Sequence, residues 1–341
     1  MNKLIKKVTA VALSALMIGG CFAGCSSSTT DDATAPSAEA AKKEYTIGIC
    51  QLVQHDALDA ATKGFMDKLT ALGEENGIKF NFVEENAAGD SATCATITNG
   101  FVADGVDLIM ANATPALQAA MTNTTEIPIV ATSVTDFATA LEIADWNGST
   151  GINVTGTSDL APLADQAAMF KDLCPDAKTI GILYCSGEPN SVYQAKVVTE
   201  ELTKLGFEVK EFTAADSNDI ASVTQTACDS CDAIYIPTDN TMASATGTIE
   251  PITSAAKIPV IAGEEGICKG CGLATLSISY YSIGEGAGQM AYDILVNGQD
   301  PATMEIQFAK DLTNKYVADR AEALGITVPD TYEAIDMTPA E

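Results

Sequence analysis

Ten short apolar runs, separated by stretches with helical spacing, constrain the fold of this chain more than any other feature. The runs lie at 45–50, 79–83, 107–111, 127–132, 151–155, 179–184, 207–212, 233–236, 258–262 and 273–278. Such runs, bounded by turn residues, are typical of strands buried on both faces of a parallel sheet. Helical spacing between them, for example over 57–72 and 191–205, indicates right-handed βαβ units. The alternation predicts an α/β fold with parallel sheets.

A weak internal repeat predicts two lobes with one topology. The sequence Thr-Ile-Gly-Ile begins at 46 and again at 179. An apolar run that begins with Asp occurs at 107 and at 232. Ile-Pro followed by two β-branched residues occurs at 127 and at 258. The offsets are 133, 125 and 131 residues, and the order is the same in all three. Three ordered matches favour two Rossmann-like, doubly wound lobes whose strand tips face one another.

The first 24 residues predict a secretory signal peptide. Three lysines precede an uncharged, mostly apolar run over 8–20, which is too short to span a bilayer. Small residues precede both Cys21 and Cys25, which resembles the lipobox of bacterial lipoproteins, and a Ser run follows Cys25. We therefore predict lipidation of Cys25, with Cys21 as the alternative and plain secretion as the third possibility.

The rest of the chain divides by composition. Residues 25–44 are rich in Ser, Thr, Ala and Asp, so they bury too little apolar surface to fold and are predicted to be a disordered tether. The whole chain is 47% hydrophobic, and the alternation begins at Tyr45. About 300 residues of this kind suit two α/β domains.

The formal net charge is −28, and removal of the leader's three lysines leaves the mature chain at −31. Such a surface repels nucleic acid and anionic membranes and keeps a protein soluble, so no nucleic-acid partner is expected. Most acidic residues are expected on solvated helix faces. Asp56, Asp90 and either Asp159 or Asp216 are expected to cap helix N-termini.

Catalytic motifs are missing from the sequence. It contains no Gly-x-Ser-x-Gly elbow, His-Glu-x-x-His pair, Walker loop or Gly-x-Gly-x-x-Gly after a strand, and it has one histidine. The glycines of 284–288 lack the Lys of a phosphate-binding loop and predict close packing of a helix over 285–296. We expect neither an enzyme nor a cofactor.

Nine motifs give the chain a family resemblance over 45–329. They are QHDALD at 54–59, GF at 64–65, NAAGD at 86–90, ATPA at 113–116, SVTD at 133–136, VTGTSD at 154–159, GEPNS at 187–191, PTDNT at 237–241 and YYxxG at 280–284. In this order they resemble the substrate-binding lipoproteins of ABC importers with the type I periplasmic-binding fold. The branch concerned is associated with tryptophan and other aromatic amino acids.

The resemblance implies a three-strand hinge between the lobes. Lobe one is then expected over 45–157 and 282–307, and lobe two over 158–281 and 308–335. It also implies a monomeric, extracytoplasmic protein, lipid-anchored to a bacterial membrane, that delivers a solute to an ABC permease. An aromatic amino acid is the expected solute. The alternatives are another amino acid or a sugar, or a surface lipoprotein with an additional adhesin role.

A zwitterionic amino acid needs N–H donors for its carboxylate and an acceptor for its ammonium group. Helix N-termini provide the donors, and Thr114 and Asn190-Ser191 are expected at two such starts. Asp239 and Asp136 each follow a strand and are the expected acceptors, with Asp239 preferred. Each of these residues has a plain alternative as a turn or helix cap.

The full set of candidate ligand-binding residues follows the strand ends. It comprises His55, Thr114, Ser133, Thr135, Asp136, Glu188, Asn190, Ser191, Thr238, Asp239, Asn240, Glu264 and Tyr280. His55, the one histidine, either contacts the ligand or packs in its own loop. Tyr280 either forms an aromatic wall of the site or belongs to the core.

Eight cysteines remain after the leader and the lipidated residue are removed. The pairs Cys228–Cys231 and Cys268–Cys271 have the spacing of a four-cysteine zinc site. Disulfides, free thiols and structural zinc are all open, with disulfides favoured if the surroundings are oxidising. Both pairs are expected at the edge of lobe two away from the ligand.

Overall fold

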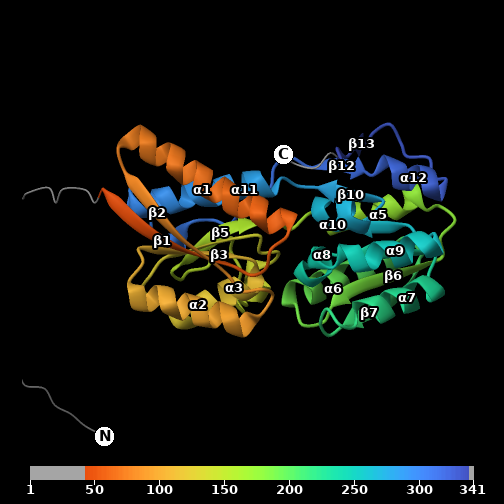
Figure 1. Ribbon diagram of the computed structural model, residues 1–341, viewed down its shortest axis with the longest axis horizontal. Helices are drawn as coiled ribbons and strands as arrows, with labels where there is room; N and C mark the ends of the chain where they lie inside the picture. The colour runs from red at the N-terminus through yellow and green to blue at the C-terminus, as the bar shows by residue number, and fades with distance from the viewer. Residues whose placement is uncertain (1–42, 338–341) are drawn as a thin grey trace, which may run out of the picture. The chain divides into compact units, whose positions relative to one another are not determined.

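The structure is a computed structural model that describes residues 43–337. It contains two sheets, each flanked by helices (Figure 1). The sheet of lobe one has the order β11-β5-β4-β3-β1-β2, and the sheet of lobe two has the order β13-β12-β10-β9-β8-β6-β7. The five strands that form the body of each sheet therefore follow the same order, which confirms the two doubly wound lobes predicted from the repeat.

Lobe one is built around a parallel sheet. Its strands are β1 (Glu44–Gln51), β2 (Lys79–Asn86), β3 (Leu108–Asn112), β4 (Ile129–Thr132), β5 (Val154–Ser158) and β11 (Gln307–Phe308). Its helices are α1 (Asp56–Asn76), α2 (Ser91–Asp104), α3 (Thr114–Asn123), α4 (Phe137–Ala140) and α11 (Tyr280–Leu295). Figure 1 shows α1 and α11 on one face of the sheet and α2 and α3 on the other. Each face has its own apolar core.

Lobe two repeats this plan and adds an edge. Its strands are β6 (Thr179–Cys185), β7 (Glu208–Ala214), β8 (Ala233–Ile236), β9 (Val260–Ala262), β10 (Ala274–Ser277), β12 (Thr313–Tyr316) and β13 (Glu333–Ala334). Its helices are α5 (Leu163–Leu173), α6 (Pro189–Lys204), α7 (Ile220–Ser230), α8 (Asn240–Ser244), α9 (Thr246–Ala256), α10 (Glu265–Cys271) and α12 (Ala318–Leu324). A 3-10 turn, η1 (Pro301–Thr303), precedes β11.

The chain passes between the sheets three times: after β5, between β10 and α11, and between β11 and β12. All ten predicted apolar runs overlap a strand, although the run at 151–155 shares only two residues with β5. The short strands β11, β12 and β13 were not predicted, because none contains an apolar run; β12 is half-buried, and β11 and β13 are exposed. Strand β12 runs antiparallel to β10, so the added edge departs from the parallel rule.

Helices α1 and α11 pack backbone to backbone. A Cβ at Gly64 would lie 2.1 Å from the carbonyl oxygen of Tyr281, and one at Gly284 would lie 2.1 Å from that of Ala61. The close packing predicted for 284–288 is thus confirmed, although the helix begins at Tyr280 rather than at 285. The contact holds the N-termini of α1 and α11 together at the carboxyl edge of the sheet.

Among the expected N-caps, Asp90 caps α2 by accepting a hydrogen bond from the backbone N–H of Ala92. The prediction for Asp159 is wrong, because α5 begins four residues later, behind Pro162. Asp56 is the first residue of α1 rather than its cap, and Asp216 closes a turn ahead of α7. Asp159 is thereby free for another role.

The chain's single arginine, Arg320 on α12, clamps the end of α10. Its guanidinium donates hydrogen bonds to the carbonyl oxygens of Cys268, Lys269, Gly270 and Gly272 at 2.7–2.9 Å. Because the last carbonyl groups of a helix have no partner within it, this clamp satisfies the C-terminus of α10.

The eight cysteines of residues 43–337 are buried and unbridged. In the same residues, no three His, Cys, Asp or Glu side chains are grouped to hold a metal ion, so the zinc alternative gains no support. None of the described helices has the length and apolarity to cross a membrane. The signal peptide, the lipidation sites and nearly all of the tether lie outside the described residues.

Candidate ligand-binding cleft

All thirteen candidate residues lie at the carboxyl ends of the central strands of the two sheets, where open α/β sheets bind their ligands. In lobe one, His55 follows β1, Thr114 follows β3, and Ser133, Thr135 and Asp136 follow β4. In lobe two, Glu188, Asn190 and Ser191 follow β6; Thr238, Asp239 and Asn240 follow β8; Glu264 follows β9; and Tyr280 follows β10. We call the space between these two sets the cleft.

The strand tips of lobe one are strained. Ala113 and Ser133, directly after β3 and β4, have φ values of +91° and +55°. Non-glycine residues in such conformations cost about 1–3 kcal/mol each and are concentrated at functional sites. The hydroxyl oxygen of Ser133 is buried and has no hydrogen-bond partner within the described chain. Buried polar groups are normally hydrogen-bonded, so this hydroxyl is available to a partner in the cleft.

Three helices begin at the cleft without a side-chain cap: α1 behind His55, α3 behind Ala113 and α6 behind Glu188. Helices α3 and α6 each have Pro in the first turn. A helix N-terminus carries unpaired N–H groups and the positive end of the dipole, so an uncapped one favours an anion. The predicted helix starts at Thr114 and at 190–191 are therefore present and open.

In lobe two, Asn190 adds a second unpartnered group. Its amide nitrogen donates to Glu188 and to the carbonyl oxygen of Thr238, at 3.1 and 3.2 Å. Its amide oxygen is buried and has no partner among residues 43–337. Ser191 beside it is fully buried. The cleft thus holds one unpartnered oxygen from Ser133 of lobe one and one from Asn190 of lobe two.

All four candidate acids, Asp136, Glu188, Asp239 and Glu264, accept backbone N–H groups at helix starts. Asp239 accepts hydrogen bonds from the backbone N–H groups of Cys185 (2.7 Å) and Met242 (2.8 Å), and is only 1% exposed. Burial and the nearby Glu188 raise the pKa of Asp239 to about 8. Both oxygens of Glu188 accept from Asn240 and Thr241, and Asp136 caps α4. These carboxylates already accept hydrogen bonds from the backbone, which favours the capping alternative for Asp136 and Asp239.

Asp159 is the acid that sequence reasoning missed, because it was expected only as a helix cap. It accepts hydrogen bonds from the hydroxyls of Thr135 (3.0 Å) and Tyr280 (2.8 Å), and burial raises its pKa. Its position directly after β5 was the available signal. Its partners are neutral, so its charge is uncompensated within the described chain.

Glu264 lies near Asp159 and caps α10 through the backbone N–H groups of Gly266 and Ile267. It is 2% exposed, and burial together with Asp159 raises its pKa to about 7. None of the ion pairs among residues 43–337 involves Asp159 or Glu264. Two buried acids without a basic partner make this part of the cleft favourable for a cation.

One side-chain hydrogen bond joins the two rims of the cleft. The Nε2 atom of His55 lies 3.2 Å from the amide oxygen of Asn240. Because the amide nitrogen of Asn240 donates to Glu188, its oxygen is the acceptor and Nε2 of His55 carries the proton. Burial lowers the pKa of His55, so the neutral ring is favoured. Thr238 is bonded within lobe two, to Gln194 and Gly263.

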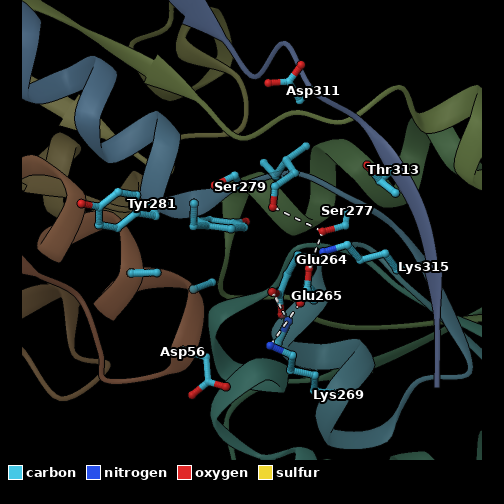
Figure 2. Close-up of a pocket in the computed structure, with 15 residues that line it drawn as sticks. Asp56, Glu264, Glu265, Lys269, Ser277, Ser279, Tyr281, Asp311, Thr313 and Lys315 are labelled. Carbon is cyan, nitrogen blue, oxygen red and sulfur yellow. Dashed lines mark hydrogen bonds and ion pairs between the residues drawn. The ribbon is translucent and has the colours of Figure 1, made fainter. Parts of the chain in front are cut away.

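Cavities of about 320, 390 and 260 Å³ lie along the cleft. Glu264 and Tyr280 line the first, His55 and Glu264 the second, and Glu188 and Asn240 the third. Figure 2 shows the first cavity, with Asp56 and Tyr281 on one side of it and Glu264, Glu265 and Lys269 on the other. Volumes near 300 Å³ are those of small-molecule sites.

Comparison with known proteins finds a family model and a relative that each match most of this chain. The family model described as ABC transporter substrate binding protein matches residues 46–336. A tyrosine-binding protein of Clostridioides difficile (strain R20291) is 34% identical over 291 residues, which are 85% of this chain and 84% of the relative.

Two solved structures are similar as well. A Streptococcus pneumoniae ABC domain in complex with L-Trp has a TM-score of 0.79 and 32% identity, over 84% of this chain and 97% of that one. A ligand-free, open substrate-binding protein with adhesive properties from Clostridium difficile has a TM-score of 0.66 and 35% identity, over 86% and 100%. At similar identity, this structure is thus closer to the L-Trp complex than to the open form.

The two matched sheets, the cleft at their carboxyl edges and these comparisons lead to one conclusion. The family model spans most of the chain, and the relative covers 85% of it. The protein belongs to the ABC transporter substrate-binding protein family.

Proposed function

We propose that this substrate-binding protein closes its two lobes on an aromatic amino acid, Trp, Tyr or Phe, and delivers it to an ABC permease. The observation that carries the proposal is a division of charge inside the cleft. Uncapped helix starts face it at α3 and α6, whereas Asp159 and Glu264 have no basic partner in residues 43–337. This is the arrangement that a zwitterion needs. The relative named for tyrosine and the L-Trp complex support the aromatic class.

The carboxylate of the ligand belongs at the start of α3. There the N–H groups of the first turn are open, and the hydroxyl of Ser133 from the next strand end is unpartnered. Thr114 is 3% exposed and adds a second hydroxyl. The open start of α6 contributes further N–H groups from lobe two. Charge-assisted hydrogen bonds of this kind are about twice as strong as neutral ones.

The ammonium group belongs beside Asp159 and Glu264. A cation there offsets the cost of burying two carboxylates and relieves the mutual repulsion that raises the pKa of Glu264. Asp239, which the sequence favoured as the acceptor for the ammonium group, instead supports this side of the cleft by capping α8. The remaining candidates, including Glu188, Ser191, Thr238 and Asn240, hold the strand tips of lobe two in position.

Closure follows from contacts to both lobes. A ligand that bonds the strand tips of lobe one and the acids of lobe two stabilises only the closed form, and so shifts the equilibrium towards it. The chain's three crossings between the sheets form the hinge. Export by the leader and anchoring through Cys25, or Cys21, would hold the monomer beside its permease.

A thermal-shift screen against the twenty amino acids and common sugars tests the function. A ligand at a hundred times its dissociation constant adds roughly 2.7 kcal/mol to the free energy of unfolding. We expect large shifts with Trp and Tyr and none with sugars. A shift with a sugar and none with Trp, Tyr or Phe would refute the proposal. A shift with only a small aliphatic amino acid would retain the zwitterion site and refute the aromatic class.

A further inference from the structure

The first cavity of the cleft has apolar walls. Ala57 and Ala60 of α1 line it together with Ile278 and Tyr280, and these four side chains belong to one apolar cluster. Ala57, Ile278 and Tyr280 are each at most 6% exposed. Small side chains on α1 leave room where larger ones would fill the space. The walls come from lobe one and from the crossing between β10 and α11, so an occupant would contact both sides of the cleft.

A compact group of polar side chains closes one end of this cavity (Figure 2). The carboxylate of Glu265 accepts hydrogen bonds from Ser277 and Lys315, both at 2.7 Å, and pairs with Lys269 at 3.1 Å. The two lysines and the serine hold the pKa of Glu265 at about 2, against the opposing effect of burial. The group therefore presents an ionised acceptor, Glu265, at every physiological pH.

The ammonium site proposed above adjoins the same cavity. Glu264 and Tyr280 both line it, and the hydroxyl of Tyr280 is bonded to Asp159. An amino acid held by its ammonium group at Asp159 and Glu264 would thus direct its side chain between the apolar walls, towards Glu265.

We infer that this cavity receives the side chain of the ligand, and that the Glu265–Lys315 pair selects aromatic rings with an O–H or N–H group over phenylalanine. This inference rests on the proposed function. A phenol can donate to Glu265 and accept from Lys315, and an indole can donate to Glu265. Because Glu265 already has three partners, phenylalanine leaves no group unpaired. The expected discrimination is therefore about tenfold, far below that of a site with an unpaired donor or acceptor.

Calorimetric dissociation constants for Tyr, Trp and Phe test the inference. We expect the wild-type protein to bind Tyr and Trp about tenfold more tightly than Phe. In Glu265→Gln, that ratio should fall to about twofold. Glu201→Gln is the matched control, because it removes an acid–lysine pair with Lys204 on the surface of α6. This control should keep the tenfold ratio.

Ala57→Leu and Ala60→Leu test where the ring lies. Each fills the cavity and should weaken all three aromatic ligands at least tenfold. Ala60 is the more exposed of the two, so it gives a second variant if Ala57→Leu does not fold. Folded variants with unchanged affinities, or an unchanged ratio in Glu265→Gln, would overturn the inference and leave the proposed function intact. A wild-type protein that binds no aromatic amino acid would overturn the proposed function itself.

Discussion

Lobe one and lobe two share one strand order but differ at the ends of their strands. Lobe one opens the N-termini of α1 and α3 to the cleft and has a neutral residue, Ala113, at the tip of β3. Lobe two leaves α6, the counterpart of α1, without a side-chain cap but closes α8, the counterpart of α3, with Asp239. It also closes α10 with Glu264, as lobe one closes α4 with Asp136. The tips of β3 and β8 therefore differ most: the first presents an open helix start, and the second presents a buried acid.

This difference gives the cleft a polarity that neither lobe has alone. A zwitterion can bind in only one orientation, with its carboxylate towards lobe one and its ammonium group towards Asp159 and Glu264. The start of α3 is satisfied only when a ligand is present, whereas that of α8 is satisfied at all times. Mutations at these two places should therefore separate: those beside the start of α3 should affect affinity, and loss of the α8 cap should affect stability.

The largest effect is expected for Asp239→Ala. The change removes the cap of α8 and leaves the buried N–H of Cys185 unpaired, so the free energy of unfolding should fall by about 3 kcal/mol. Chemical denaturation measures it. Asp90→Ala removes an exposed cap in lobe one and should cost about 1 kcal/mol. Equal losses in the two variants would contradict the structural role of Asp239.

Gly284→Ala tests how lobe one positions its open helix starts. The added methyl group would lie 2.1 Å from the carbonyl oxygen of Ala61, so α1 and α11 must move apart. We expect a loss of about 2 kcal/mol of stability and weaker ligand binding. Gly100→Ala on α2 meets no atom within 4 Å and should be neutral or slightly stabilising. A neutral Gly284→Ala would show that the contact is dispensable.

Ser133→Ala should weaken the ligand about tenfold without destabilising the free protein. The hydroxyl removed has no partner among residues 43–337, so its loss should cost little stability, and the complex loses a charge-assisted hydrogen bond. Calorimetry and thermal unfolding without ligand measure the two quantities. If stability falls and affinity does not, Ser133 is structural.

Affinity should rise with pH, because a bound ammonium group stabilises ionised carboxylates and releases their protons. With the pKa of Glu264 near 7 in the free protein, binding at pH 6 should be about tenfold weaker than at pH 8. The raised pKa of Asp159 adds to the effect in the same direction. In Glu264→Gln the pH dependence should be reduced. Affinity that falls as the pH rises would exclude these acids as the ammonium site.

The smallest effect is expected for His55→Ala. Loss of the hydrogen bond to Asn240 should cost the closed form about 1 kcal/mol, and so weaken the ligand about fivefold through faster dissociation. Stopped-flow kinetics separate the two rates. Lys63→Ala, which breaks an exposed ion pair on the same helix, is the control and should leave both rates unchanged.

The sequence was sufficient to predict the strands, the two lobes and the strand ends that form the cleft. These features are local: an apolar run followed by small polar residues is read from neighbours in the chain. The role of each carboxylate could not be read this way. The hydrogen-bond partner of Asp239 at Cys185 is 54 residues away, that of Glu188 at Asn240 is 52, and that of Asp159 at Tyr280 is 121.

Dependence on residues far away in the sequence also explains why some strands were not predicted. Strand β12 reads Thr-Asn-Lys-Tyr, which has no apolar run, and it forms only because β10 offers an open edge. The cluster around Glu265 joins α10 to β12, so it too depended on a strand that the pattern did not reveal. Short polar edges take their structure from a partner strand rather than from their own composition.

The backbone contact between α1 and α11 also bears on how the protein can be made. Helix α11 covers the face of the sheet that carries Ile47 and Met110, yet it is synthesised after nearly all of lobe two. A nascent chain ending at β5 holds all of the first lobe's strands except β11, but leaves that apolar face covered only in part, by α1. Neither lobe can therefore be completed from a contiguous segment as it leaves the ribosome. The two lobes must mature together, late in synthesis, and a truncated chain should aggregate rather than yield an isolated lobe.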